Sequence, residues 1–262
     1  MTMIREPAVA GQFYPENASE LHTAIRAFFE DVRVTPGPAP KALIVPHAGY
    51  IYSGPVAATA YARLRSYGKQ YTRVILLGPA HRVAVRGLAL SAADVFRTPL
   101  GDVPLDSEAI AALAMPEVTI FDGAHQFEHC LEVHLPFLQS VIESFSIVPL
   151  IVGEVAAATV AEVIDALWGG PETLIVVSSD LSHYLTYEKA RTIDNATCQA
   201  IENLEVDRID HQAACGATPI SGLLIAARRR GMTVTTLDLR NSGDTAGDRT
   251  RVVGYGSWLL LE

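Results

Sequence analysis

Three apolar runs in this sequence are each followed, within a few residues, by side chains that can bind a metal ion or transfer a proton. The runs cover residues 42–45, 74–77 and 174–177, and Pro, Gly or Ser residues end each of them. The side chains that follow are those of His47, His81, Asp180 and His183. Short apolar runs of this kind are typical of strands buried on both faces of a sheet.

Ligands of open α/β sheets bind in the crevice outside the carboxyl ends of the strands. If the three predicted strands are parallel neighbours, His47, His81, Asp180 and His183 should therefore converge on one site. A single histidine near a strand end is more often an ordinary hydrogen-bonded side chain. Here the same arrangement recurs three times, which favours a shared site for metal binding or proton transfer.

The cysteines differ in their surroundings. Cys215 lies in the segment AACGATPI, just before a helix whose N-cap we expect at Thr218. A thiolate is favoured near a helix N-terminus, and the thiolate is the form that binds metals. Cys198 lies among apolar residues of a predicted helix and is expected to be a small buried hydrophobe. Cys130 has polar neighbours, and the sequence does not decide between a ligand and a buried side chain.

The densest polar cluster is the segment HQFEHCLEVHLP at 125–136, and its titratable residues are His125, Glu128, His129, Glu132 and His134. A zinc-protease motif would need two histidines four apart with Glu after the first, but Gln126 stands in that place. On a helix, Glu128 and Glu132 would share a face. We expect Glu128, His129, Glu132 and His134 to border the site and orient its ligands, with a purely structural polar network as the alternative.

Other motifs that would indicate chemistry are missing or weak. The sequence has no G-x-x-x-x-G-K-[ST] phosphate loop and no G-x-S-x-G nucleophile elbow. Ser178, Ser179 and Asp180 followed by His183 could suggest a hydrolase, but without the elbow this signal is weak. The glycine-rich segment at 241–248 is more typical of a turn than of an anion site.

Composition excludes several classes of protein. The 262 residues are 49% hydrophobic and 19% charged, which is ordinary for a globular protein, and the net charge of −9 argues against a nucleic-acid surface. The first residues contain no apolar segment typical of a signal peptide, and no apolar run is long enough to span a bilayer. Three cysteines without paired spacing suggest a reducing, cytoplasmic setting.

Strands alternate with predicted helices along the whole chain, which indicates an α/β fold. We see no internal repeat and no low-complexity linker, so we expect one domain over residues 1–262. The predicted helices cover approximately residues 19–32, 56–64, 107–114, 157–168, 187–204 and 218–231.

The sequence resembles the Memo family, which includes the Memo-like component B of the AmmeMemoRadiSam system. The resemblance runs over nearly the whole chain and is carried by the segments REPAVAGQFYP, VPHAGYIYSG, LLGPAHR, RTPLGDVPLD, EHCLEVHLPFLQ, VVSSDLSH, ACGATPI and NSGDTAGDRTRVVGYG. It implies a single-domain layered sandwich like that of the class III extradiol dioxygenases, with a largely parallel or mixed sheet and helices on both faces. It also implies a metal site formed by His47 in PHAGY, His81 in GPAHR and Cys215 in ACGATP, with Asp180 and His183 beside it.

The implied site departs from that of the dioxygenases, which hold Fe(II) with two histidines and one carboxylate. Cys215 would offer a softer ligand, so Fe(II) is the first expectation, while copper and zinc remain open. In the first hypothesis the protein is a metal-dependent redox enzyme acting on a small molecule. His183 would be its acid or base, and Asp180 would orient either His183 or a metal-bound water.

The second hypothesis is a non-catalytic metal-binding or partner-binding module, and the third is a zinc-dependent hydrolase. The retention of Asp180 and His183 favours an enzyme, because a binding module does not need an acid/base pair. Other proteins of the AmmeMemoRadiSam system are the macromolecular partners that the resemblance implies.

Overall fold

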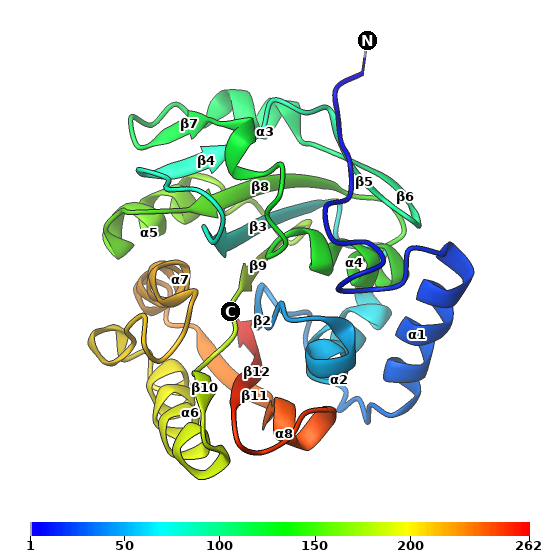
Figure 1. Ribbon diagram of the computed structural model, residues 1–262. Coiled ribbons are helices and arrows are strands. Elements are labelled where there is room, and N and C mark those ends of the chain that lie inside the picture. The colour runs from blue at the N-terminus through cyan, green and yellow to red at the C-terminus, as the bar shows by residue number, and fades with distance from the viewer. Residues whose placement is uncertain (1) are drawn as a thin grey trace.

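The computed structural model describes residues 2–262 (Figure 1). Its main sheet is mixed and has nine strands. Its order is β10-β12-β2-β9-β3-β8-β4-β7, and β11 pairs with β12. These strands are β2 (Ala42–Val45), β3 (Arg73–Pro79), β4 (Leu88–Leu90), β7 (Val118–Ile120), β8 (Ser146–Val152), β9 (Thr173–Ser178), β10 (His183–Leu185), β11 (Thr233–Asn241) and β12 (Val252–Leu261).

The centre of the sheet is parallel, as the apolar runs predict. Strand β9 lies between β2 and β3 and is parallel to both, and β3 is parallel to β8. The register pairs Val45 of β2 with Ser178 of β9, and Leu77 of β3 with Val177 of β9. The three strands that precede the predicted site residues therefore end at the same edge of the sheet. Strand β12 is antiparallel to β2, and β4 is antiparallel to β8.

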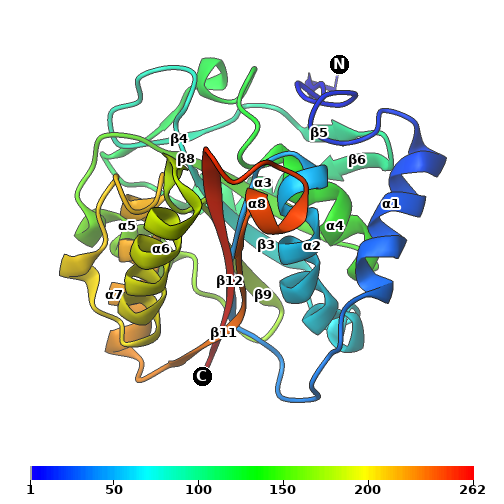
Figure 2. The same ribbon diagram turned by 60° about the horizontal axis from the view of Figure 1, so that its bottom comes forward.

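Helices cover both faces of the sheet, because alternate residues of the central strands are apolar on each side. Leu43 and Val45 face a core shared with α1 (Ala18–Glu30), α2 (Tyr50–Tyr61) and α4 (Leu135–Val141). Ala42 and Ile44 face a second core shared with α5 (Ala157–Ala166), α6 (Tyr187–Glu202) and α7 (Ala217–Arg229). Figure 2 shows these two helix layers on either side of β11 and β12. The short helices are α3 (Ser107–Ala112), α8 (Ser242–Thr245) and the 3-10 turns η1 (Ala62–Tyr67), η2 (Asp122–Ala124), η3 (Glu132–His134) and η4 (Val206–Arg208).

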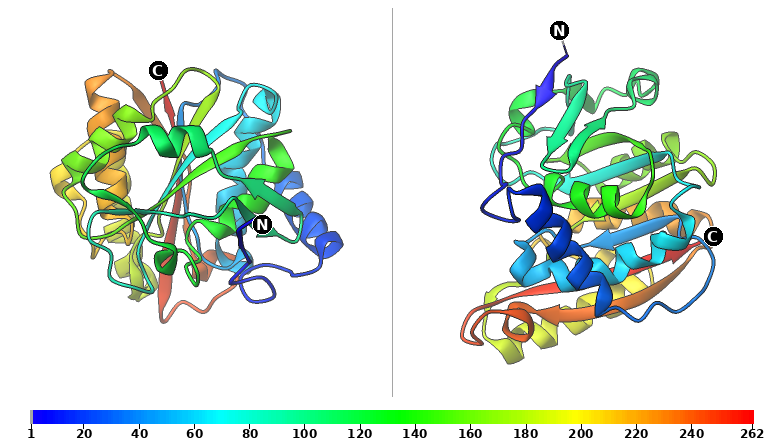
Figure 3. Two further views of the ribbon diagram at one scale, coloured as in Figure 1. Left: turned by 90° about the horizontal axis from the view of Figure 1, so that it is seen from above. Right: turned by 90° about the vertical axis from the view of Figure 1, so that its right-hand side faces the viewer.

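A small second sheet ties the N-terminal segment to the body of the protein. It has the order β1-β5-β6, formed by β1 (Ile4–Arg5), β5 (Val95–Thr98) and β6 (Gly101–Pro104), and is seen beside the N-terminus in Figure 3. Arg5 is buried, forms an ion pair with Glu132, and donates hydrogen bonds to the carbonyls of His125 and Glu128. The N-terminal segment thereby fixes the path of the polar segment 125–134.

The predicted α/β fold, with a mixed sheet and helices on both faces, is confirmed. One local expectation is wrong, because α7 begins at Ala217 with Gly216 as its N-cap residue, before Thr218. The segment 125–134 forms turns and the 3-10 turn η3. Within residues 2–262, no helix combines the length and the apolar character that crossing a bilayer requires.

Candidate metal centre

The loops after β2 and β9 are joined at the crevice by a buried hydrogen bond. The backbone N–H of His47 donates to Oδ1 of Asp180 over 2.7 Å. Asp180 follows β9 directly, and its backbone also bonds to Cys215, whose N–H donates to the carbonyl of Asp180 over 3.2 Å. The loops that carry His47, Asp180 and Cys215 thus hold one another in place, and Cys215 reaches the site from the segment before α7.

Three side chains from separate loops bring donor atoms together. One ligand atom each of His47, His81 and Cys215 lies within 4.8 Å of the other two. The Sγ of Cys215 is 3.3 Å from Nε2 of His47, and the centroids of the two imidazole rings are 5.1 Å apart. Two nitrogens and one sulfur at this spacing can surround a single transition-metal ion.

Hydrogen bonds on the Nδ1 side of His47 determine which of its ring nitrogens is free to bind a metal ion. The Oγ of Ser178 donates to the carbonyl of Cys130 over 2.7 Å, so the hydroxyl has only lone pairs left for its other neighbours. Those neighbours are Nδ1 of His47 at 2.6 Å and Nε2 of His134 at 2.8 Å, and both must donate to it. Nδ1 of His134 then accepts from the hydroxyl of Tyr61 at 2.8 Å. With its proton on Nδ1, His47 presents the lone pair of Nε2 to Cys215.

His81 is oriented in the same way by Glu128. Its Nδ1 lies 3.0 Å from Oε1 of Glu128, and its backbone N–H donates to Oε2 of the same carboxylate over 2.7 Å. A carboxylate that accepts the Nδ1 proton leaves Nε2 of the histidine for a metal, which is the usual arrangement around ligating histidines. The site residues therefore fit a metal ion that is bound by two imidazole Nε2 atoms and one sulfur.

A second group of donor atoms, from His81, Glu128 and His129, also lies within 4.8 Å. Glu128 is not free to serve as its ligand, because its Oε1 already accepts from the backbone N–H groups of His129 and Cys130, at 2.9 and 3.2 Å. Burial alone would raise the pKa of Glu128, but its contacts with the rings of His129 and His81 hold that pKa well below its usual range. Glu128 is thus an ionised acceptor that orients histidines.

Protonation in the metal-free protein agrees with this arrangement. Burial, and after it the neighbouring rings of His81, His129 and His134, hold the pKa of His47 well below its ordinary value. Burial also lowers the pKa of His134 to about 3, followed by the effect of His129. Both imidazoles are therefore neutral at pH 7, which is the form that ligates metals.

Cys215 contradicts one expectation from the sequence. Its position before α7 suggested a thiolate favoured by the helix, but burial, with the nearby charge of Asp180, raises the pKa of the thiol to about 12. The backbone N–H of Asp180 donates to Sγ over 3.3 Å and lowers the pKa of the thiol, but by less than burial raises it. Without metal, Cys215 is a thiol whose hydrogen can point at Nε2 of His47, and a metal ion would replace that proton.

A crevice of about 690 Å³ opens in front of His47 and His81, and Cys215 lies beside His47 without lining it. Asp180 and His183 both line it, as the sequence analysis expected, but no hydrogen bond joins them. Asp180 is 4% exposed and bonded to His47, whereas His183 is exposed on β10. Burial raises the pKa of Asp180, while the N–H of His47 lowers it in part. The other walls include Phe13, Tyr52, Arg82, Tyr184, Arg251 and Tyr255.

The predicted bordering residues separate into two groups. His129 stacks on His81 with 4.8 Å between ring centroids and lines the crevice, and His134 reaches His47 through Ser178. Glu132 does not face the site. Its carboxylate pairs with Arg5 and accepts from the hydroxyl of Tyr14 and two backbone N–H groups of the N-terminal segment, so its role is in holding that segment.

The remaining cysteines and His125 are not among the candidate ligands, although the carbonyl of Cys130 accepts from Ser178. Cys198 is buried with its Sγ 3.1 Å from Oγ1 of Thr236, in agreement with a small buried side chain. Cys130 is fully buried and donates to the carbonyl of Pro79, while Nε2 of His125 lies 3.0 Å from the carbonyl of Ala89. Ser178 and Tyr61 were not predicted as part of the site. The sequence signals for Ser178 were its position at the end of an apolar run and the weak hydrolase pattern with Asp180 and His183, and neither indicates a role in orienting His47.

Comparison with known proteins shows the family of this chain. The family model described as "Memo-like protein" matches residues 5–259 of the chain. The chain belongs to the Memo family. Memo-family relatives are similar over nearly their full lengths: a "MEMO1 family protein" of Methanococcoides burtonii is 38% identical over 98% of this chain and 100% of its own, and one of Aquifex aeolicus is 36% identical over 98% and 99%.

A MEMO1 family protein of Aeropyrum pernix is 37% identical over 96% of this chain and 98% of its own. Among solved structures, the uncharacterized protein JW3007 of Escherichia coli K12 superposes with a TM-score of 0.54 at 15% identity, over 84% of this chain and 99% of its own. At that identity the likeness shows a shared fold alone. In this Memo-family chain, the chemistry of the site depends on the residues described above.

Proposed function

We propose that this Memo-family protein binds one transition-metal ion through His47, His81 and Cys215 and uses it as a dioxygenase-like oxidoreductase on a small molecule. The observation that carries the metal site is the pair of fixed tautomers. Ser178 and Glu128 take the Nδ1 protons of the two histidines, so that both Nε2 atoms are free beside Cys215. Nothing in ordinary packing requires the buried imidazole of His47 and the more exposed one of His81 to be oriented toward the same thiol.

The ligand chemistry favours a redox-active metal. Two imidazoles and one thiolate suit iron, copper and zinc, and we place Fe(II) first and copper second. A bound iron or copper ion would supply one-electron redox chemistry and would retain open coordination positions, because only three protein ligands converge here. Zinc at the same site would instead support hydrolysis, which is the weaker alternative.

The crevice supports an enzyme that acts on a small molecule. At about 690 Å³ it lies within the size range of ligand sites, and two of the candidate ligands, His47 and His81, line it. His183 stands exposed on its wall and can exchange a proton with a bound substrate. Asp180 holds the loop of His47 through one oxygen, and we propose that it keeps the local charge balance and the position of His47.

The proposal can be tested by metal analysis and oxygen uptake. Protein purified without oxygen should carry close to one iron or copper ion per chain, and the metal should be lost in the variant His47→Ala. The iron-loaded protein should then consume oxygen with at least one member of a panel of small aromatic and carboxylic substrates. The variant His183→Gln should keep its metal and lose most of that activity.

A chain that gains no iron, copper or zinc on titration would refute the metal site. A chain that holds iron but consumes no oxygen with any substrate would leave a metal-binding module as the function.

A further inference from the structure

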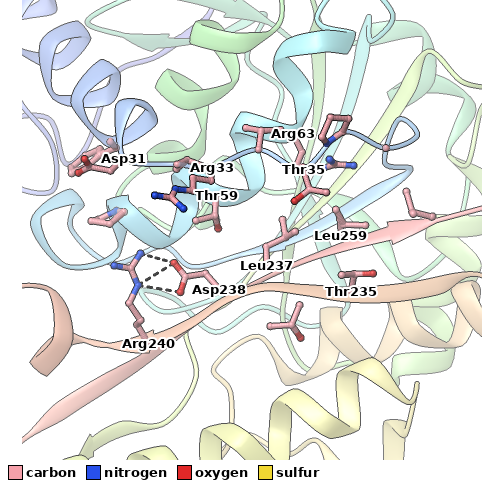
Figure 4. Close-up of a pocket in the computed structure, with 18 of the residues that line it drawn as sticks. Asp31, Arg33, Thr35, Thr59, Arg63, Thr235, Leu237, Asp238, Arg240 and Leu259 are labelled. Carbon is pink, nitrogen blue, oxygen red and sulfur yellow. Dashed lines mark hydrogen bonds and ion pairs between the residues drawn. The ribbon is translucent and has the colours of Figure 1, made fainter.

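A second cavity, separate from the metal centre, lies between the linker that leads into β2, helix α2 and strands β11 and β12. Its volume is about 860 Å³, and no residue lines both this cavity and the crevice of the metal centre. Figure 4 shows Arg63 at one end of this cavity, the Asp238–Arg240 ion pair at the other, and the side chains of Leu237 and Leu259 between them.

Arg63 is the unusual member of this cavity. It is only 9% exposed, yet no carboxylate of residues 2–262 forms an ion pair with it, and its Nε has no hydrogen-bond partner there. Other arginines in protected positions are compensated, since Arg5 pairs with Glu132 and Arg73 with Asp106. A guanidinium stays charged in proteins, so a buried one without a partner calls for an anion from outside the chain.

The surroundings of Arg63 keep its guanidinium facing the cavity. Gly37 of the linker packs directly against it, and a Cβ atom at this position would come within 2.8 Å of Nη2. The absent side chain at Gly37 therefore leaves the space that the guanidinium occupies. Thr59, one helical turn before Arg63, lines the same cavity.

The lining residues also restrict the anion. A guanidinium offers two parallel N–H groups, which match the two oxygens of a carboxylate. The charged residues that line the cavity balance, and they are Asp31, Asp238, Asp244, Arg33, Arg63 and Arg240. The cavity therefore offers no excess of positive charge to a doubly charged phosphate, whereas one guanidinium suffices for a singly charged carboxylate. Leu237 and Leu259 provide an apolar surface for the rest of the ligand. We propose that this cavity binds a small organic monocarboxylate, with its carboxylate on Arg63 and its apolar body along β11 and β12.

Titration calorimetry of the full-length, metal-free protein with hexanoate as the probe tests this site, with inorganic phosphate as a second probe. We expect hexanoate to bind once per chain and to raise the midpoint of thermal unfolding. Arg63→Met keeps the length of the side chain and removes its charge, so it should weaken binding at least about tenfold. The unliganded variant should unfold at the same or a higher temperature, since a buried unpaired charge is gone.

Two further variants keep the test decisive if Arg63→Met folds poorly. Gly37→Ala should weaken hexanoate binding, because its Cβ displaces the guanidinium, and Arg65→Met, which changes an exposed arginine of the same 3-10 turn, should leave binding unchanged. The site is refuted if neither probe binds, or if hexanoate binds equally well to Arg63→Met or Gly37→Ala. Binding of phosphate alone would refute the assignment to a carboxylate.

Discussion

Replacement of Ser178 by Ala tests how the protein prepares His47 for a metal. The hydroxyl of Ser178 is fully buried and takes part in three hydrogen bonds, to His47, His134 and the carbonyl of Cys130. Its removal leaves two ring N–H groups and one carbonyl without a partner. Each orphaned buried group costs about 1–3 kcal/mol, so we expect the free energy of unfolding to fall by about 3 kcal/mol or more.

Ser178→Ala should also bind metal more weakly. Without Ser178 the Nδ1 proton of His47 has no acceptor, and the imidazole can rotate or change tautomer. Loss of such an orienting partner typically weakens metal affinity about 10–100-fold, which corresponds to about 1.4–2.7 kcal/mol. Affinity is measured by zinc titration against a chromophoric chelator, and stability by urea unfolding of the metal-free protein.

Ser182→Ala is the matched control. Ser182 is also fully buried after β9, but its hydroxyl interacts with the carboxylate of Asp194 and with no candidate ligand. Removing this hydroxyl should leave zinc affinity unchanged and should destabilise the protein less than Ser178→Ala does, because Ser178 makes three hydrogen bonds. If Ser178→Ala binds zinc as tightly as the unmodified protein, the hydrogen-bond chain does not orient His47, and that part of the reasoning is wrong.

Four further outcomes are expected. Since the pKa of Cys215 is raised to about 12 and that of His47 is depressed, metal binding must displace one thiol proton. Zinc affinity should therefore rise about tenfold per pH unit between about pH 7 and 9, and a flat profile in chelator competition would contradict this. Cys215→Ser should lose that slope and most of its zinc and copper affinity, whereas Cys198→Ser should change stability alone; equal metal content of the two variants would exclude Cys215 as a ligand. His129→Ala should weaken metal binding about 10–100-fold without abolishing it, as judged by the same titration. Glu132→Ala leaves Arg5 buried without its partner and should cost about 3–5 kcal/mol in urea unfolding, with no change in zinc affinity.

The sequence predicted the features that depend on short-range pattern. The runs before His47, His81 and Asp180 are apolar at every position because β2, β3 and β9 are buried on both faces. The parallel pairing that places their carboxyl ends at one edge was a condition of the prediction, and the structure confirms it. From there the meeting of His47 with Asp180 follows from the general rule for ligand sites in α/β sheets.

The features that were missed depend on contacts between distant residues. The path of the segment 125–134 depends on Arg5, about 120 residues away, which donates to the carbonyls of His125 and Glu128 and pairs with Glu132. The role of Ser178 depends on a histidine 131 residues away, and no local pattern reveals it. The thiol of Cys215 was assigned too low a pKa because the sequence shows the helix after it and does not show its burial.

X-ray absorption at the zinc edge of the zinc-loaded protein tests the central claim most directly, because it reads the ligand atoms themselves. Two imidazole nitrogens at about 2.0–2.1 Å and one sulfur at about 2.3 Å are expected, with the sulfur lost in Cys215→Ser and one nitrogen lost in His81→Ala. A zinc ion surrounded only by nitrogen and oxygen, or a sulfur signal that persists in Cys215→Ser, would contradict the site formed by His47, His81 and Cys215.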